Sequence, residues 1–329
     1  MSRRHVSLLV KLIIAGVLLG WLVRSGSLDF GALAIFFEHP ALLVANLGVF
    51  VGTYLIAAVR WRLLLQVAGI ELPLRRAIQL TLTAAFFNVV APGNIGGDVV
   101  KAIYVARDLP PNQRPSVYLI GFLDRLVAVG GLVAVAVALN VGSRVFSDDS
   151  QLSEPTTAIA ILALVTIVLP VVGLGLVRRF AKDDDGSTDG MSRVATLRGR
   201  LIAAAKLVSA RPGALALSLV LSIAIHACGI IWFSAVASAV LDQHVSVPQM
   251  AAVYPLGMLS VLLPISYAGF GVGHIAFEQL FAMIGLTGGA NVINVYLIGL
   301  LVPCLFGVIP YLLLKREAGA PGEAELPST

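Results

Sequence analysis

The chain has 329 residues, of which 58% are hydrophobic and only 12% charged, and its formal net charge is +5. A soluble domain carries about 25% charged residues, so this composition excludes an ordinary soluble enzyme or binding domain. The basic residues lie between long apolar runs rather than on an aromatic-flanked basic helix, so we expect no nucleic-acid partner.

Six apolar runs are long enough to cross a bilayer as helices, because about 20 residues span the hydrocarbon core. Arg3 and Arg4 precede the first run, and no small-residue cleavage site follows it, so we expect an uncleaved first helix. The sequence therefore predicts an all-α integral membrane protein that forms a single membrane domain over 1–329. In chain order, the predicted spans cover 6–23, 41–59, 116–142, 157–177, 213–241 and 291–314.

Arginine and lysine residues fall almost entirely on one side of the membrane when these spans are threaded in order. The opposite side holds only Arg24 and Arg144. The positive-inside rule then places both termini in the cytoplasm, and we expect a multi-pass protein of the cell (inner) membrane. The segment 178–212 is predicted to be a cytoplasmic linker, and 315–329 a disordered cytoplasmic tail.

A glycine- and proline-broken stretch interrupts the apolar sequence between the second and third spans. It runs from Asn88 through Pro92 to Asp98, and basic residues flank it on both sides. The apolar part before Pro92 is too short to cross the membrane and return. We therefore expect residues 77–107 to enter the membrane from the cytoplasm and leave on the same side.

A second broken stretch lies between the fifth and sixth spans, within residues 249–289. It begins at Pro264 and contains Ser266, Gly269 and Gly271. The predicted topology makes it enter from the outside. The halves 1–142 and 157–314 then each contain two spans, a re-entrant segment and a further span, in that order. This is the pattern of an inverted-topology repeat, in which the binding site is expected between the two breaks.

The first broken stretch has the residues of an anion site. Gly93, Gly96 and Gly97 allow unusual backbone conformations, and the following helix would present free N–H groups to a lipid phosphate. Lys101, about one turn further on, would add a positive charge. Alternatively, these glycines serve only a tight turn and close helix packing.

Three further charged residues are predicted to lie at membrane depth. Asp98 suits a helix N-cap, and it could instead meet Arg125 or the cationic head of an aminoacylated lipid. Asp124 and Arg125 are adjacent, so on one helix they need different partners. Charges at this depth mark transport pathways, although side chains near a helix end can also extend to the interface.

His274 and Glu278 are four residues apart in the second stretch and could share a helix face. Two ligands do not make a metal site, so we expect no metal and no cofactor.

Several of these strings together resemble the lysylphosphatidylglycerol synthase transmembrane-region family over nearly the whole chain. They are N-x3-P-G-x2-G-G-D-x2-K from Asn88, the Asp124-Arg125 pair, and P-x-S-x2-G-x-G-V from Pro264. The resemblance implies a flippase-like protein that moves aminoacylated or otherwise modified lipids between leaflets. Because the chain ends soon after its last predicted span, we expect the soluble synthase domain to be absent.

The sequence departs from the family pattern in both stretches. Lys101 stands where the family commonly has arginine, and Gly273-His274 stands where it commonly has Arg-Glu. Glu278, one helical turn later, would then be the substitute charge in the second stretch.

Three functions follow from these observations, and the first is preferred. The chain would be a transporter, and not an enzyme, for a modified or anionic phospholipid or a polyprenyl-phosphate-linked lipid. Alternatively it would be a membrane enzyme whose Asp98, Lys101, Asp124 and Arg125 process a lipid phosphate, or a non-catalytic partner of a separate synthase or glycosyltransferase. Membrane lipids are the expected partners, and the oligomeric state, including a homodimer, stays open.

Overall fold

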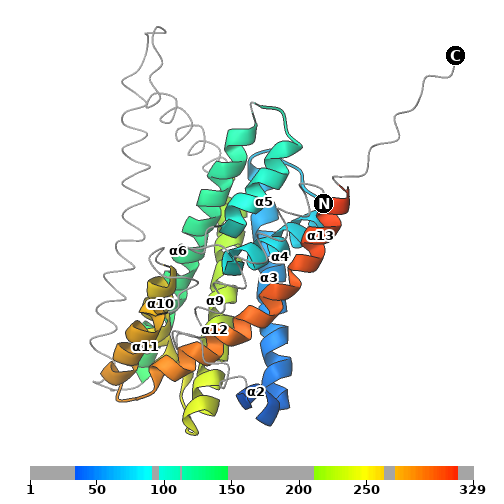
Figure 1. Cartoon of the computed structure of the whole chain (residues 1–329). Helices are drawn as coiled ribbons and strands as arrows, with labels where there is room; N and C mark the ends of the chain where they lie inside the picture. The colour runs from blue at the N-terminus through cyan, green and yellow to red at the C-terminus, as the bar shows by residue number, and fades with distance from the viewer. Residues whose placement is uncertain (1–33, 91–95, 112, 147–210, 263–270, 318–329) are drawn as a thin grey trace, which may run out of the picture.

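The computed structural model describes residues 34–90, 96–111, 113–146, 211–262 and 271–317. In this part of the chain every regular element is a helix, which confirms the predicted all-α class (Figure 1). In order, the helices are α2 (Ala34–Glu38), α3 (Pro40–Val67), α4 (Leu74–Val90), α5 (Gly96–Arg107), α6 (Arg114–Phe146), α9 (Pro212–Leu241), α10 (Val247–Leu262), α11 (Val272–Met283), α12 (Gly289–Phe306) and α13 (Val308–Glu317).

Four segments are long and apolar enough to cross a membrane, and each matches a span expected from the sequence. They are Pro40–Val67, Arg114–Ala138, Pro212–Leu241 and Gly289–Leu314. The other two predicted spans, 6–23 and 157–177, lie outside the described residues, as does most of the predicted linker 178–212. Helix α13 continues to Glu317, three residues into the predicted tail.

Helix α3 extends well beyond the predicted end of its span at residue 59. The apolar pattern continues after Arg60 and Arg62, and the helix ends only at Val67. Gly69, with φ of 72°, takes the left-handed conformation that follows a helix end, and the Ile70 N–H donates to the Leu65 carbonyl at 3.0 Å. Arg60 therefore lies inside a helix and is buried, rather than lying in a loop.

Each broken stretch is part of a hairpin of two short helices. Helix α4 packs against α5, and α10 packs against α11. The connecting residues 91–95 and 263–270 lie outside the described residues. Figure 1 shows the two hairpins toward opposite ends of the long helices. Among the described residues, the order α3, α4–α5, α6 is followed by the similar order α9, α10–α11, α12.

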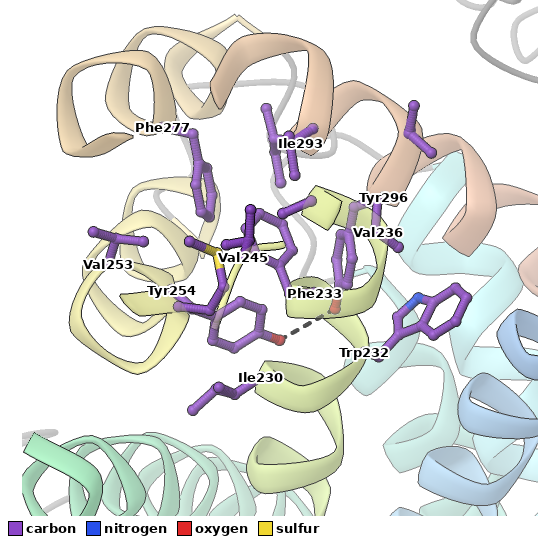
Figure 2. Close-up of a cluster of buried hydrophobic side chains, with 14 of the residues drawn as sticks. Ile230, Trp232, Phe233, Val236, Val245, Val253, Tyr254, Phe277, Ile293 and Tyr296 are labelled. Atoms are coloured by element: carbon purple, nitrogen blue, oxygen red, sulfur yellow. Dashed lines mark hydrogen bonds between the residues drawn. The ribbon is translucent and has the colours of Figure 1, made fainter. Parts of the chain in front are cut away.

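An aromatic cluster holds the α10–α11 hairpin against the long helices (Figure 2). The ring of Phe233 on α9 lies 5.3 Å from Tyr254, 4.9 Å from Phe277 and 5.3 Å from Tyr296, measured between centroids. The hydroxyls of Tyr254 and Tyr296 are 3.2 Å apart. Aromatic contacts of this kind, two of them edge-to-face and the Phe233–Phe277 pair tilted, add to the stability gained from burial, so this hairpin is a packed part of the core.

Candidate functional site

Five charged side chains from α3, α5 and α6 form one continuous group, which we call the charge network. Asp124 on α6 lies between two cations, with Oδ1 at 2.8 Å from Arg60 Nε and Oδ2 at 3.3 Å from Lys101 Nζ. Asp98 on α5 also lies between two, with Oδ1 at 3.1 Å from Lys101 Nζ and Oδ2 at 2.6 Å from Arg125 Nε. Cations and carboxylates thus alternate from Arg60 to Arg125.

The charge network is buried at one end and partly open at the other. The side chains of Arg60, Lys101 and Asp124 are 8%, 6% and 8% exposed, whereas those of Asp98 and Arg125 are 23% and 33% exposed. Burying a charge is costly unless partners compensate it, and here each buried charge has one. A polar ligand can therefore approach the network most readily at the Asp98–Arg125 end.

Of the alternatives for Asp98, the structure shows the contact with Arg125, and Asp98 lies within the first turn of α5 rather than at its N-cap. The expectation that Asp124 and Arg125 have different partners is confirmed, since Asp124 binds Arg60 and Lys101. The Asp124 side chain is buried within the protein, so extension of this residue to the membrane interface does not explain its position.

Arg60 and Trp61 belong to this site but were not predicted from the sequence. Arg60 was interpreted only as one of the charges that orient the spans. Trp61 is 1% exposed, and the Lys101 ammonium lies 4.7 Å from its ring centroid, within the range of a cation–π interaction. The run of apolar residues after Arg62 is the sequence signal that α3 continues and carries both residues inward.

The charge network is connected to α9 through Arg60. Its NH1 group donates to Ser222 Oγ at 3.1 Å, and that hydroxyl in turn donates to the Ala128 carbonyl of α6 at 3.4 Å. Helices α6 and α9 approach closely here, because a Cβ on Gly131 would lie 2.5 Å from the Ser222 Cβ. The network is thus linked to both halves of the molecule.

The start of α5 has a packing role that reduces its capacity to bind anions. The Gly97 N–H donates to Asn88 Oδ1 at 2.8 Å, so the side chain of α4 already occupies one of the free N–H groups expected at this helix end. A Cβ on Gly97 would overlap the Ala84 carbonyl. Gly97 therefore serves close helix packing, the alternative given from the sequence. Gly96 is the first residue of α5, and Pro92 and Gly93 lie outside the described residues.

The predicted residues of the second stretch lie apart from the charge network. Gly271, with φ of 86°, precedes α11, and its N–H donates to His274 Nδ1 at 3.3 Å. Glu278 accepts hydrogen bonds from the N–H groups of Gly288, at 3.3 Å, and Ala290, at 2.8 Å. His274 thus accepts a hydrogen bond from the backbone at the start of α11, and Glu278 accepts two at the start of α12. The other predicted residues of this stretch, Pro264, Ser266 and Gly269, lie outside the described residues.

Comparison with known proteins identifies the family. No curated protein and no solved structure matches the chain. The profile of the family described as Lysylphosphatidylglycerol synthase TM region matches residues 8–314, which include both hairpins and all five residues of the charge network. The chain therefore belongs to the Lysylphosphatidylglycerol synthase TM region family.

Proposed function

We propose that this protein is a flippase-like transporter that moves a modified or anionic phospholipid between membrane leaflets. Its substrate would be an aminoacylated lipid or a polyprenyl-phosphate-linked lipid. The observation that carries the proposal is the charge network, which joins charged side chains of the short helix α5 to those of α3 and α6, two helices that are long and apolar enough to span a membrane.

The cost of burying these charges supports a functional role. Replacing a buried ion pair by well-packed apolar side chains is often neutral or stabilising, so packing alone does not require such a network. Ionisable residues within membrane segments typically line substrate or ion pathways. Lys101 and Arg125 suit a headgroup phosphate, and Asp98 suits a headgroup amine.

The surroundings of Asp98 and Arg125 fit a lipid. Val99 and Ile103 on α5 are 46% and 40% exposed, and Phe122 on α6, one turn before Arg125, is 59% exposed. The partly open end of the network therefore has exposed apolar side chains on the same two helices. A headgroup bound at Asp98–Arg125 could keep its acyl chains against this apolar surface.

The hairpins suggest how the headgroup would cross. They lie toward opposite ends of the long helices, the arrangement that transporters with inverted repeats use for alternating access. The charge bias of the sequence favours a cell-membrane protein with both termini in the cytoplasm, so the α4–α5 hairpin and the charge network would face the cytoplasm. The headgroup would then cross between the charge network and the α10–α11 hairpin.

Reconstitution into liposomes with fluorescent phospholipids in one leaflet tests this proposal. Movement of the probe to the other leaflet, measured against protein-free liposomes, is the expected result. Chemical conversion of the lipid without movement would instead support the membrane enzyme. If neither occurs with aminoacylated, anionic and polyprenyl-phosphate probes, a partner role for a separate synthase replaces the transporter.

A further inference from the structure

The charge network separates by distance into two arginine–carboxylate pairs with a lysine between them. Arg60 Nε lies 2.8 Å from Asp124, and Arg125 Nε lies 2.6 Å from Asp98, which are the lengths of strong charge-assisted hydrogen bonds. Lys101 Nζ lies at longer distances, 3.1 Å from Asp98 and 3.3 Å from Asp124. The two carboxylates are therefore neutralised mainly by the two arginines.

This division assigns the excess charge of the network to Lys101. The charge network joins three cations to two carboxylates, so among these five side chains one positive charge is in excess. The Trp61 ring lies under the Lys101 ammonium and attracts it without neutralising it. A buried cation in this position favours an anionic ligand.

We propose that Arg60 is a positioning residue that makes the site selective for anionic headgroups. Arg60 neutralises Asp124 and so leaves the Lys101 ammonium for the headgroup phosphate. This inference rests on the proposed transport function. Arg60 itself is buried and contacts Oδ1 of Asp124, whereas Lys101 contacts Oδ2, so Arg60 acts through Asp124 rather than on the lipid.

The geometry explains why an arginine serves here. Its guanidinium holds two partners at once, with Nε on Asp124 and NH1 on Ser222 of α9. Ser222 is itself fixed, because its hydroxyl donates to the Ala128 carbonyl and its side chain packs against Gly131. A lysine has a single compact ammonium in place of this rigid fork, so Arg60→Lys should keep the charge but hold Asp124 less firmly.

The test compares variants of the full chain in liposomes that contain two fluorescent lipids with identical acyl chains. One probe is phosphatidylglycerol, which is anionic, and the other is phosphatidylcholine, which is zwitterionic. In Arg60→Gln, Asp124 must draw its compensation from Lys101. The ratio of the anionic to the zwitterionic transport rate should therefore fall about tenfold or more, the order expected when one nearby charge is lost at low dielectric.

The double variant Arg60→Gln with Asp124→Asn separates this role from a merely structural one. It removes a cation and a carboxylate together, so Lys101 regains its excess charge and the wild-type preference for the anionic probe should return. Arg62→Gln is the matched control, since Arg62 lies on the same helix but donates to the Leu72 carbonyl, outside the charge network. Arg62→Gln should leave the ratio unchanged.

Two results would overturn the inference while leaving the transport function intact. One is an unchanged ratio in Arg60→Gln, and the other is a double variant that shows no recovery of the anionic preference. If Arg60→Gln does not fold, Arg60→Lys takes its place, since it keeps the charge but holds Asp124 less firmly. The ratio should then fall, and an unchanged ratio in Arg60→Lys would overturn the inference. If the wild-type protein moves neither probe nor any other lipid, the proposed function fails instead.

Discussion

Arg125 Nε lies 2.6 Å from Asp98 Oδ2, and this contact joins the second helix of a hairpin to a membrane-spanning helix. The two side chains are also the most exposed members of the charge network. A ligand that carries a phosphate and an amine could break this ion pair, with its phosphate binding Arg125 and its amine binding Asp98. This pair is therefore the part of the network where we expect the lipid headgroup to bind first.

Lys101 should tolerate arginine but not a neutral side chain. Lys101→Arg keeps the positive charge between Asp98 and Asp124, so we expect most of the transport rate to remain. Lys101→Met fills a similar volume without the charge, and we expect transport of an anionic lipid to fall to the protein-free rate. Both are measured in liposomes, with size-exclusion chromatography as the check for folding. A fully active Lys101→Met would show that the lysine charge is not needed.

Gly97 should not tolerate even one methyl group. Gly97→Ala places a Cβ against the Ala84 carbonyl and Asn88 Oδ1, so α5 must move away from α4. Overpacking of this kind costs about 1–3 kcal/mol, and we expect a lower melting temperature together with loss of transport. The measurement is thermal unfolding in detergent.

Gly52→Ala on α3 is the matched control for Gly97. Nothing lies within 4 Å of a Cβ at that position, and it is within a helix. Alanine is favoured over glycine in helices by about 1 kcal/mol, so this variant should be as stable as the wild type or more so. If the two alanine variants unfold at the same temperature, the close approach of α4 and α5 is not structurally important.

Glu278 should matter for stability rather than for transport. Its carboxylate accepts hydrogen bonds from two N–H groups at the start of α12. Glu278→Ala removes this cap, which costs about 1 kcal/mol in typical helices, so the melting temperature should fall while the transport rate per folded molecule stays at the wild-type value. A folded Glu278→Ala protein that no longer transports would return Glu278 to the substrate site.

Much of the fold could be predicted because it depends on local composition. Runs of about 20 apolar residues identify spans wherever they occur, and the breaks at Pro92 and Pro264 mark the two hairpins. The Asp98–Arg125 contact was one of the alternatives that the sequence offered, because a charge buried among apolar segments needs a partner of opposite sign. The adjacency of Asp124 and Arg125 required two separate partners, which the structure shows.

The residues that were missed depend on packing between distant segments. Arg60 follows an apolar run, as does an arginine that flanks a membrane span and lies in the cytoplasm, so the sequence does not tell the two cases apart. The packing of α3 against α6 in the structure shows that Arg60 contacts Asp124. Glu278 was named from the sequence, but as a substitute charge for the substrate site, because its partners lie ten and twelve residues further along the chain. Hydropathy and charge bias do not carry this information.

The most direct test of the transport account is the rate at which a fluorescent anionic phospholipid changes leaflets in liposomes that contain the wild-type protein, Asp98→Ala or Arg125→Ala. Equal amounts of folded protein, checked by size-exclusion chromatography, make the rates comparable. A transporter with its headgroup site at this pair should give rapid movement with the wild-type protein and the protein-free rate with either variant. Wild-type rates in both variants would contradict the assignment of the Asp98–Arg125 pair as the headgroup site.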